Sequence, residues 1–272
     1  MQDASHAAQL PVSLGRFDTL NWDPRGLTRA AALGLPNTTI APGTRYSFRL
    51  LRYWFMHELL RAASREAQRP LRIAEVGVDH GQQLAFARHV LTPDTPCWWS
   101  CWDAFDAVPR HDELARVGYT SIVHVDVDRD DSTPALQARQ YDVVIACHVL
   151  EHLGDPEAAV ARMVALLAPG GLLIGGGPVL PDGLAALWEP RLRGSAKPLG
   201  HVSVLSPGRL DRMARQAGLS PLWRSGAFAV RRHGLPFEGQ RWWLRLNLAF
   251  GALLPGWPGE IYFAWRRAPA PA

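Results

Sequence analysis

A turn with two glycines and two carboxylates is the first place in the chain where chemistry is indicated. Glu75, Gly77, Asp79 and Gly81 lie in the stretch IAEVGVDHGQQL, between an apolar segment and a helical pattern. Glycine turns of this kind let a backbone approach a bound nucleotide closely. A dinucleotide pyrophosphate would be repelled by the two carboxylates, and Asp79 stands where the dinucleotide pattern needs glycine. The turn therefore favours a ligand with a positive end and no phosphate.

Three histidines further along the chain are candidates for a general base. His148 and His152 lie in ACHVLEHL with Glu151 beside them, and His201 begins HVSVL. A hydroxyl acceptor must lose a proton near neutral pH, and histidine is the side chain that most often takes it. His152 could instead hold its own turn together. An amine acceptor, or a carbon activated by its own electronics, would need no base.

The elements that must position these residues alternate along the chain. Apolar segments typical of buried strands are separated by helical patterns, and such alternation predicts a mostly parallel sheet covered on both faces. Ligands in these sheets bind beyond the carboxyl ends of the strands. Asp155 and Ser206 are predicted helix N-caps, each followed by proline. The predicted strands cover 71–78, 97–102, 121–127, 141–150, 172–177, 222–232 and 260–267. The predicted helices cover 44–66, 81–91, 110–117 and 156–168, and a further helix starts at Pro207 within 201–219.

Over roughly residues 70–225 the chain resembles the class I S-adenosylmethionine-dependent methyltransferases. The resemblance rests on EVGVDHG, CWWSCWDAFD, YDVVIACHVLEHLGDPEAAVARMVALLAPGGLLI and HVSVLSPGRLDRMARQAGL, in that order. It departs from the family pattern at Asp79, where glycine is usual. It implies a Rossmann-like α/β sheet, mostly parallel with an antiparallel last strand and helices on both faces. It also implies S-adenosylmethionine as the cofactor.

The resemblance implies cofactor contacts at four strand ends. The turn after the first strand would hold the methionine part, and Glu75 would reach its ammonium through water. An acid just past the second strand would hold the ribose, because paired carboxylate oxygens suit a vicinal diol. His148 would offer its carbonyl to the ammonium. The expected cofactor residues are Glu75, Gly77, Asp79, Gly81, Asp103 with Asp106 as the fallback, Asp126 or Asp128 with Val127 at the adenine, and His148.

Two segments flank this core. We expect residues 1–66 to form an N-terminal arm and a helical lid, with plain packing as the alternative for the helix at 44–66, and 67–272 to form the cofactor-binding domain. Candidate substrate residues on that helix are Tyr46, Tyr53, Trp54 and His57. An aromatic and basic insert at about 238–258 could pack on the core, form a homodimer, line the substrate pocket or lie on a membrane surface.

Composition argues against several classes of function. The net charge is +4, but the arginines are dispersed and no nucleic-acid module is evident. Lys197 is the only lysine, which indicates GC-rich, bacterial coding. Three cysteines, an odd count with no paired CxxC motif, indicate reduced thiols and a cytoplasmic protein. The acidic run 126–131 is expected to be a solvated loop, and no metal is expected.

The sequence thus predicts an enzyme that uses S-adenosylmethionine to methylate a small molecule or glycan, with oxygen as the favoured acceptor atom. A non-catalytic scaffold of the same fold is one alternative. A lipid-linked or macromolecular acceptor is another.

Overall fold

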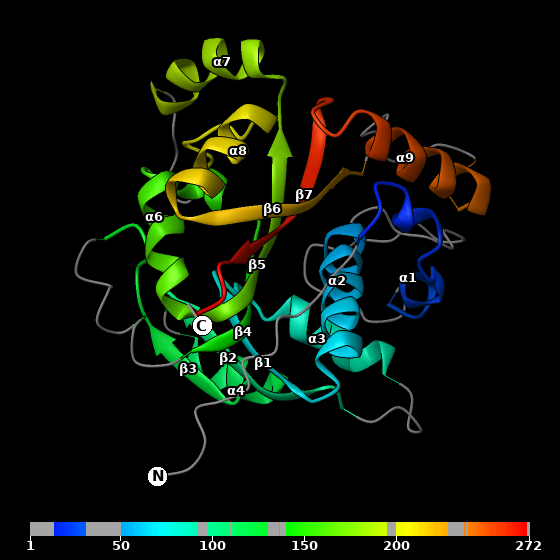
Figure 1. The fold of residues 1–272 in the computed structure, drawn as a ribbon, viewed down its shortest axis with the longest axis vertical. Helices are drawn as coiled ribbons and strands as arrows, with labels where there is room; N and C mark the ends of the chain where they lie inside the picture. The colour runs from blue at the N-terminus through cyan, green and yellow to red at the C-terminus, as the bar shows by residue number, and fades with distance from the viewer. Residues whose placement is uncertain are drawn as a thin grey trace.

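A seven-stranded sheet forms the centre of the molecule (Figure 1). The computed structural model describes residues 14–30, 50–91, 97–108, 110–129, 136, 140–194, 200–227, 237 and 239–270. The strands are β1 Leu71–Val76, β2 Trp99–Asp106, β3 Ser121–His124, β4 Tyr141–Cys147, β5 Leu167–Val179, β6 Leu219–Gly226 and β7 Gly259–Arg267.

The strand order is β3-β2-β1-β4-β5-β7-β6. The pairs from β3 to β5 are parallel, and β7 runs antiparallel to both of its neighbours, β5 and β6. The predicted Rossmann-like sheet, mostly parallel with an antiparallel last strand, is confirmed. In such a sheet the carboxyl ends of β1, β2 and β4 meet at one edge, where a ligand binds.

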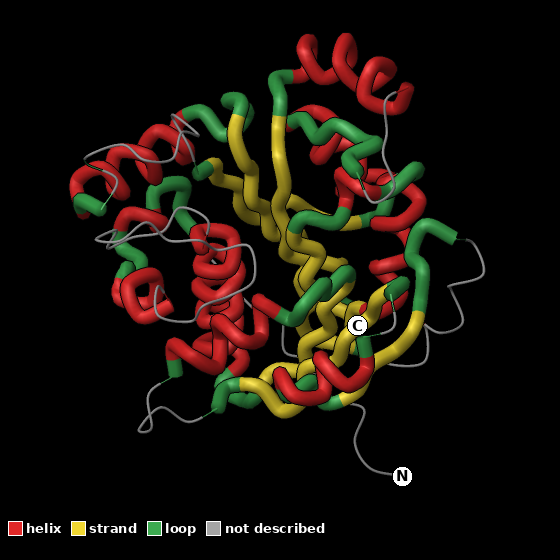
Figure 2. The backbone as a smooth tube through the Cα atoms, turned by 180° about the vertical axis from the view of Figure 1, so that it is seen from behind, coloured by secondary structure: helices red, strands yellow, loops and turns green. Residues whose placement is uncertain are grey.

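Helices cover both faces of this sheet (Figure 2). Neighbouring residues on a strand face opposite sides. In β4, for example, Val143 and Ile145 pack in one core, and Val144 packs in the other. The helices are α1 Arg25–Ala30, α2 Leu51–Ala67, α3 Gln82–Val90, α4 His111–Val117, α6 Pro156–Met163, α7 Asp182–Gly194, α8 Pro207–Gln216 and α9 Arg241–Leu253.

The helix predicted at 44–66 is α2, and it packs directly on the sheet. Trp54, Phe55 and Leu60 are fully buried and share one core with strand residues such as Ile73. Residues 51–67 therefore fold together with the sheet, as the plain-packing alternative expects. Only the first turn of α2 lies near the sheet edge described below. Tyr46 lies outside the described residues.

Two helix starts follow the predicted caps. Asp155 accepts a hydrogen bond from the Ala158 N–H, and Ser206 accepts one from the Arg209 N–H. The helix predicted at 156–168 is shorter than expected. It ends at Met163, a 3-10 turn follows, and β5 begins at Leu167. Gly170 and Gly171, which follow the predicted helix, therefore lie inside a strand, where β5 shifts register against β4.

The predicted insert is the helix α9, which connects β6 to β7. One side of it, including Trp243, Leu244 and Leu248, is buried against β6 and the 3-10 turn η1 (Asp18–Leu20). The opposite side exposes Trp242 and Leu246. Among the described helices, none has the length and apolar character needed to cross a bilayer.

Candidate active site

The turn after β1 has the left-handed backbone that a close ligand contact needs. Gly77, Asp79 and Gly81 have φ values of 67°, 48° and 72°. A Cβ added at Gly77 would lie 2.7 Å from Cγ2 of Val149, which follows β4. Glycine is therefore required at Gly77 for both conformation and space. The Gly77 N–H donates to the Phe105 carbonyl, which ties the turn to β2.

Asp79 replaces the usual glycine without changing the sign of φ. Aspartate is one of the few side chains that tolerate the left-handed region. The backbone N–H of Asp79 donates to Oδ2 of Asp106 at 3.2 Å. Its carboxylate accepts from Nε2 of Gln82 and lies 3.2 Å from Nη1 of Arg110. The departure from the family pattern at Asp79 therefore leaves a left-handed turn with an additional polar anchor.

Glu75 lies buried in β1, beneath the turn. Its Oε2 accepts hydrogen bonds from Nε1 of Trp102 at 2.9 Å and from the hydroxyl of Tyr119 at 2.8 Å. Burial outweighs these two hydrogen bonds and raises the pKa of Glu75 to about 7, and the nearby Asp106 adds to the rise. Near neutral pH this carboxyl is therefore partly protonated.

The position of Asp103 differs from the sequence prediction. β2 continues to Asp106, so Asp103 lies inside the strand, paired with Ala74 and Ser121. Its Oδ2 accepts from the hydroxyl of Tyr141 at 2.6 Å. The prediction that Asp103 lies just past the second strand is wrong, because pairing with β1 and β3 carries that strand four residues beyond its predicted end, to Asp106.

Asp106 occupies the strand end that had been assigned to Asp103. Its two carboxylate oxygens accept from the backbone N–H groups of Asp79 and Val108. The side chain is buried beside the turn that begins at Gly77. Each carboxylate oxygen has two acceptor sites, so both can accept one further hydrogen bond. Asp106 is therefore the acid positioned for a diol at this edge.

The acids after β3 have different surroundings. Asp128 accepts from the backbone N–H groups of Gly154 and Asp155, so its carboxylate holds the turn before α6. Asp126 accepts the Asp128 N–H and is partly exposed. Val127 is buried in the core, and its carbonyl accepts from Arg162. Of the two acids, Asp126 is the one whose side chain is free of the α6 turn.

His148 follows β4 and has an unusual backbone and two acidic partners. Its φ is 57°, in the left-handed region. Nδ1 lies 3.0 Å from Oε1 of Glu151, and Nε2 lies 3.6 Å from Oε2 of Glu260. Burial alone would lower the pKa of His148, but these two carboxylates reverse the effect and hold it above its ordinary value.

Sequence reasoning missed Arg52 and Glu260, which complete a row of alternating charges. Glu260 is the second residue of β7 and is almost fully buried, and its Oε1 lies 2.9 Å from Nη2 of Arg52 on α2. The hydroxyl of Tyr262 donates to its other oxygen. Burial would raise the pKa of Glu260, but His148 and Arg52 hold it below the ordinary range. The one signal in the sequence was an acid beginning an otherwise apolar strand.

The other two predicted base candidates lie side by side. The rings of His152 and His201 are 4.9 Å apart, and both residues are exposed. Nδ1 of His152 lies 3.2 Å from the Gly200 carbonyl. His152 belongs to the 3-10 turn η4 (Leu150–His152), which also carries Glu151. All three predicted histidines therefore gather where β4 ends.

Two of the predicted substrate residues have different environments. His57 is buried between the rings of Phe86 and Trp98, and burial lowers its pKa to about 3. Its prediction as a pocket residue is wrong, since it is a neutral core histidine. Tyr53 is partly exposed, and its carbonyl accepts from Gln83 in the first turn of α3.

The sheet order, the left-handed turn after β1 and the acid at the end of β2 together define the class I methyltransferase fold. A family model described as a methyltransferase domain matches residues 46–222, and the chain belongs to that family. S-adenosylmethionine is the cofactor of this class. The close backbone approach at Gly77 and the buried carboxylate of Asp106 fit it.

Solved structures share this fold at low sequence identity. The trans-methyltransferase CalH, solved in complex with SAH, aligns with a TM-score of 0.54 and 21% identity over 80% of this chain and 58% of CalH. A candidate sarcosine dimethylglycine methyltransferase from Galdieria sulphuraria aligns with a TM-score of 0.52 and 14% identity, covering 79% of this chain and 86% of that one. The chain thus spans little more than half of CalH. No curated protein matches it.

Proposed function

We propose that this protein transfers the methyl group of S-adenosylmethionine to a small molecule or glycan, at a hydroxyl oxygen. The observation that carries the proposal is the pairing of the Gly77 turn with the Asp106 carboxylate at one sheet edge. The cofactor supplies a methyl group on a sulfonium, which leaves as a neutral thioether. The protein therefore has mainly to align the acceptor and manage one proton.

The residues at this edge would contact different parts of the cofactor. The Gly77 backbone would lie against the methionine part, and Asp106 rather than Asp103 would accept the two ribose hydroxyls. Asp126 and Val127 would flank the adenine. The carbonyl of His148, which follows β4 directly, would accept from the ammonium.

The surroundings of the histidines separate the base candidates. Both ring nitrogens of His148 face carboxylates, which raise its pKa above the ordinary value, so it is less suited to accept a proton from an acceptor. His152 differs because Nδ1 can donate to the Gly200 carbonyl, which leaves Nε2 with a lone pair. We therefore favour His152, with its neighbour His201, as the group that meets the acceptor.

Calorimetric titration with S-adenosylmethionine, S-adenosylhomocysteine and NADH as the control tests the proposal. We expect micromolar binding of the two sulfur nucleosides and none of NADH. Asp106→Asn should weaken binding at least tenfold, because two charge-assisted hydrogen bonds are lost. Asp103→Asn is the matched control and should change affinity little. If Asp103→Asn weakened binding and Asp106→Asn did not, Asp103 rather than Asp106 would be the residue that binds the ribose. Cofactor binding without methyl transfer to any acceptor would favour the scaffold alternative.

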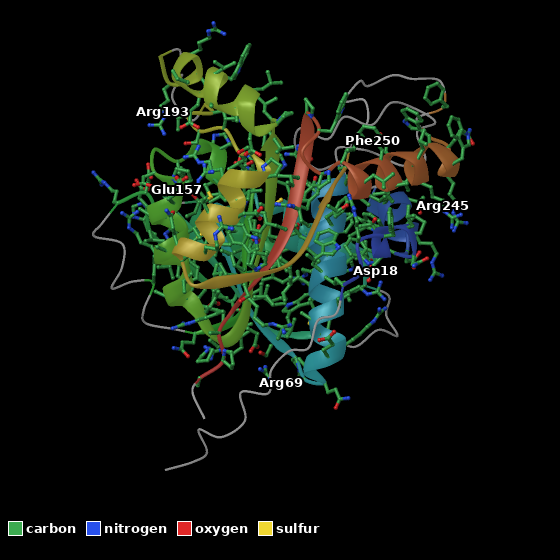
Figure 3. The ribbon with its side chains drawn as sticks, turned by 45° about the horizontal axis from the view of Figure 1, so that its top comes forward. Asp18, Arg69, Glu157, Arg193, Arg245 and Phe250 are labelled. Carbon is green, nitrogen blue, oxygen red and sulfur yellow. The ribbon has the colours of Figure 1, made fainter. Side chains whose placement is uncertain are left out.

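A lipid-linked acceptor is a second candidate, favoured by the exposed side of α9. Trp242, Leu246, Leu253 and Trp257 are each about half exposed and recur at helical spacing on and just after α9. Arg241 and Arg245 are exposed on the same helix, and Figure 3 shows Arg245 pointing away from the body of the protein. Apolar side chains flanked by arginines suit an anionic membrane surface.

The position of α9 supports this candidate. β7 starts where β5 ends, since Gly259 pairs with Val179, so α9 leads into the sheet at the carboxyl edge of β5. A membrane under α9 would therefore bring lipid-linked acceptors to the same edge as the cofactor turn.

Sedimentation with vesicles tests membrane binding. We expect binding to phosphatidylglycerol vesicles that salt weakens, and little binding to phosphatidylcholine. Trp242→Ser with Leu246→Ser should abolish it. Leu187→Ser with Trp188→Ser, on the exposed side of α7, is the control and should not. A homodimer that the α9 variant dissociates, without vesicle binding, would contradict the membrane candidate.

A further inference from the structure

Glu151, His152 and His201 form a compact group of potential metal ligands beside His148. One atom from each, a carboxylate oxygen or an imidazole nitrogen, lies within 4.8 Å of the other two. Glu151 is buried, and both histidines are exposed. We propose that these three side chains bind one divalent transition-metal ion at the carboxyl edge of the sheet. This departs from the expectation of no metal, which considered only the cysteines and the acidic run after β3.

The carboxylate of Glu151 is the strongest indication of a ligand. The residue is 1% exposed, and its Oε2 meets no hydrogen-bond donor in the described part of the chain. A buried carboxylate oxygen without a partner is costly and calls for a cation. His148 holds the other oxygen through Nδ1 at 3.0 Å, which fixes the orientation of the carboxylate. At Gly177 a Cβ would lie 3.0 Å from Oε2, so glycine leaves room there.

The hydrogen bond of the His152 imidazole leaves one ring nitrogen able to bind a metal. Its Nδ1 can donate to the Gly200 carbonyl at 3.2 Å, so the proton resides on Nδ1 and the lone pair on Nε2. Metal-binding histidines are characteristically oriented by such a hydrogen bond from the nitrogen that does not bind the metal. The ring centroid of His201 lies 4.9 Å from that of His152.

The backbone keeps the His201 segment next to the Glu151 turn. The N–H groups of Val202 and Ser203 both donate to the Glu151 carbonyl, at 2.8 and 3.1 Å. Ser203 also donates through its hydroxyl to the Leu153 carbonyl. The two segments, about fifty residues apart in the chain, are therefore positioned by contacts that do not involve the imidazoles.

The ligand types indicate which cations fit. Two imidazole nitrogens with one carboxylate suit zinc, iron, cobalt or nickel better than magnesium or calcium, which prefer oxygen ligands. Ligand atoms about 2.1 Å from one ion lie roughly 3–4 Å apart. The exposed imidazoles can turn inward to reach this spacing. Their exposed side leaves coordination positions open for acceptor oxygens. This last role rests on the proposed function. With an ion bound, Nε2 of His152 would be a ligand, and the ion rather than this nitrogen would make the acceptor hydroxyl easier to deprotonate.

Cobalt(II) titration of the tag-free, EDTA-treated full chain tests the site. We expect one equivalent to bind and give visible ligand-field absorption, and zinc to displace it. His201→Ala removes an exposed ligand without disturbing the core and should weaken binding at least tenfold. Glu151→Gln should do the same. His111→Ala, an exposed histidine on α4, is the matched control. Equal binding by the wild-type protein and His201→Ala, or no stoichiometric binding, overturns the proposal.

The same samples distinguish this site from the proposed function. Cofactor titration in EDTA reports on the Gly77 and Asp106 region without a metal. Cobalt binding without cofactor binding would refute the proposed methyltransferase activity and leave the metal site intact. Cofactor binding without cobalt binding would refute the metal site alone.

Discussion

The buried carboxyl of Glu75 should make folding stability depend on pH in a way that one substitution removes. Glu75→Gln keeps the shape of the side chain, and its amide oxygen can still accept from Trp102 and Tyr119. The variant cannot ionise. Its free energy of unfolding should therefore lack the contribution that comes from the raised pKa.

The magnitude follows from the pKa. Burial raises the pKa of Glu75 from its ordinary value of 4.5 to about 7. Between these values the folded protein keeps a proton that the unfolded chain has released. The stabilising contribution is thus complete below pH 4.5 and is lost as pH rises through 7. The whole difference corresponds to about 3 kcal/mol, most of which falls between pH 5 and 8.

Urea unfolding at pH 5 and pH 8 measures this directly. We expect the wild-type protein to lose roughly 2–3 kcal/mol more than Glu75→Gln between the two pH values. Other titrating groups, such as His57, are present in both proteins and cancel in the comparison. Equal losses for the two proteins would mean that Glu75 ionises normally, and the reasoning from burial would be refuted.

Three further substitutions probe the site. Gly77→Ala places a Cβ 2.7 Å from a valine methyl at a φ of 67° and should weaken cofactor binding at least tenfold in calorimetry; Gly183→Ala, where a Cβ meets nothing within 4 Å, should not. Glu260→Gln leaves Arg52 without its buried partner and should lower the free energy of unfolding in urea by about 3 kcal/mol. Adding Arg52→Gln should recover part of this stability. An unchanged urea midpoint for Glu260→Gln would contradict the role of the charge row. Asp128→Ala removes the acceptor of two backbone N–H groups and should cost about 1–2 kcal/mol, seen as a lower melting temperature.

Local signals allowed much of the fold to be predicted. The alternation of apolar segments predicted the sheet, and Asp155 and Ser206 predicted two helix starts. The end of β2 was misplaced because it depends on pairing with neighbouring strands, which no local pattern near Asp103 reports. Asp79 departs from the family pattern, yet aspartate can adopt the left-handed backbone that the turn requires.

Long-range contacts explain what the sequence could not reveal. Arg52 and Glu260 are separated by most of the chain, and neither belongs to a motif. Their meeting depends on β7 lying between β5 and β6, which only the assembled sheet determines. His57 illustrates the opposite error, because a histidine on an amphipathic helix gives no sign of whether it faces a pocket or a core.

The place of β7 in the sheet has a consequence for how the protein is made. β6 is synthesised before β7, yet β7 lies between β5 and β6. Until residues 259–267 leave the ribosome, β5 and β6 each present an unpaired edge, and such edges promote aggregation of nascent chains. The same strand delivers Glu260, so the charge row that joins α2 to the end of β4 forms only when the sheet closes. The need for chaperones and the formation of the complete site should therefore both depend on the synthesis of β7.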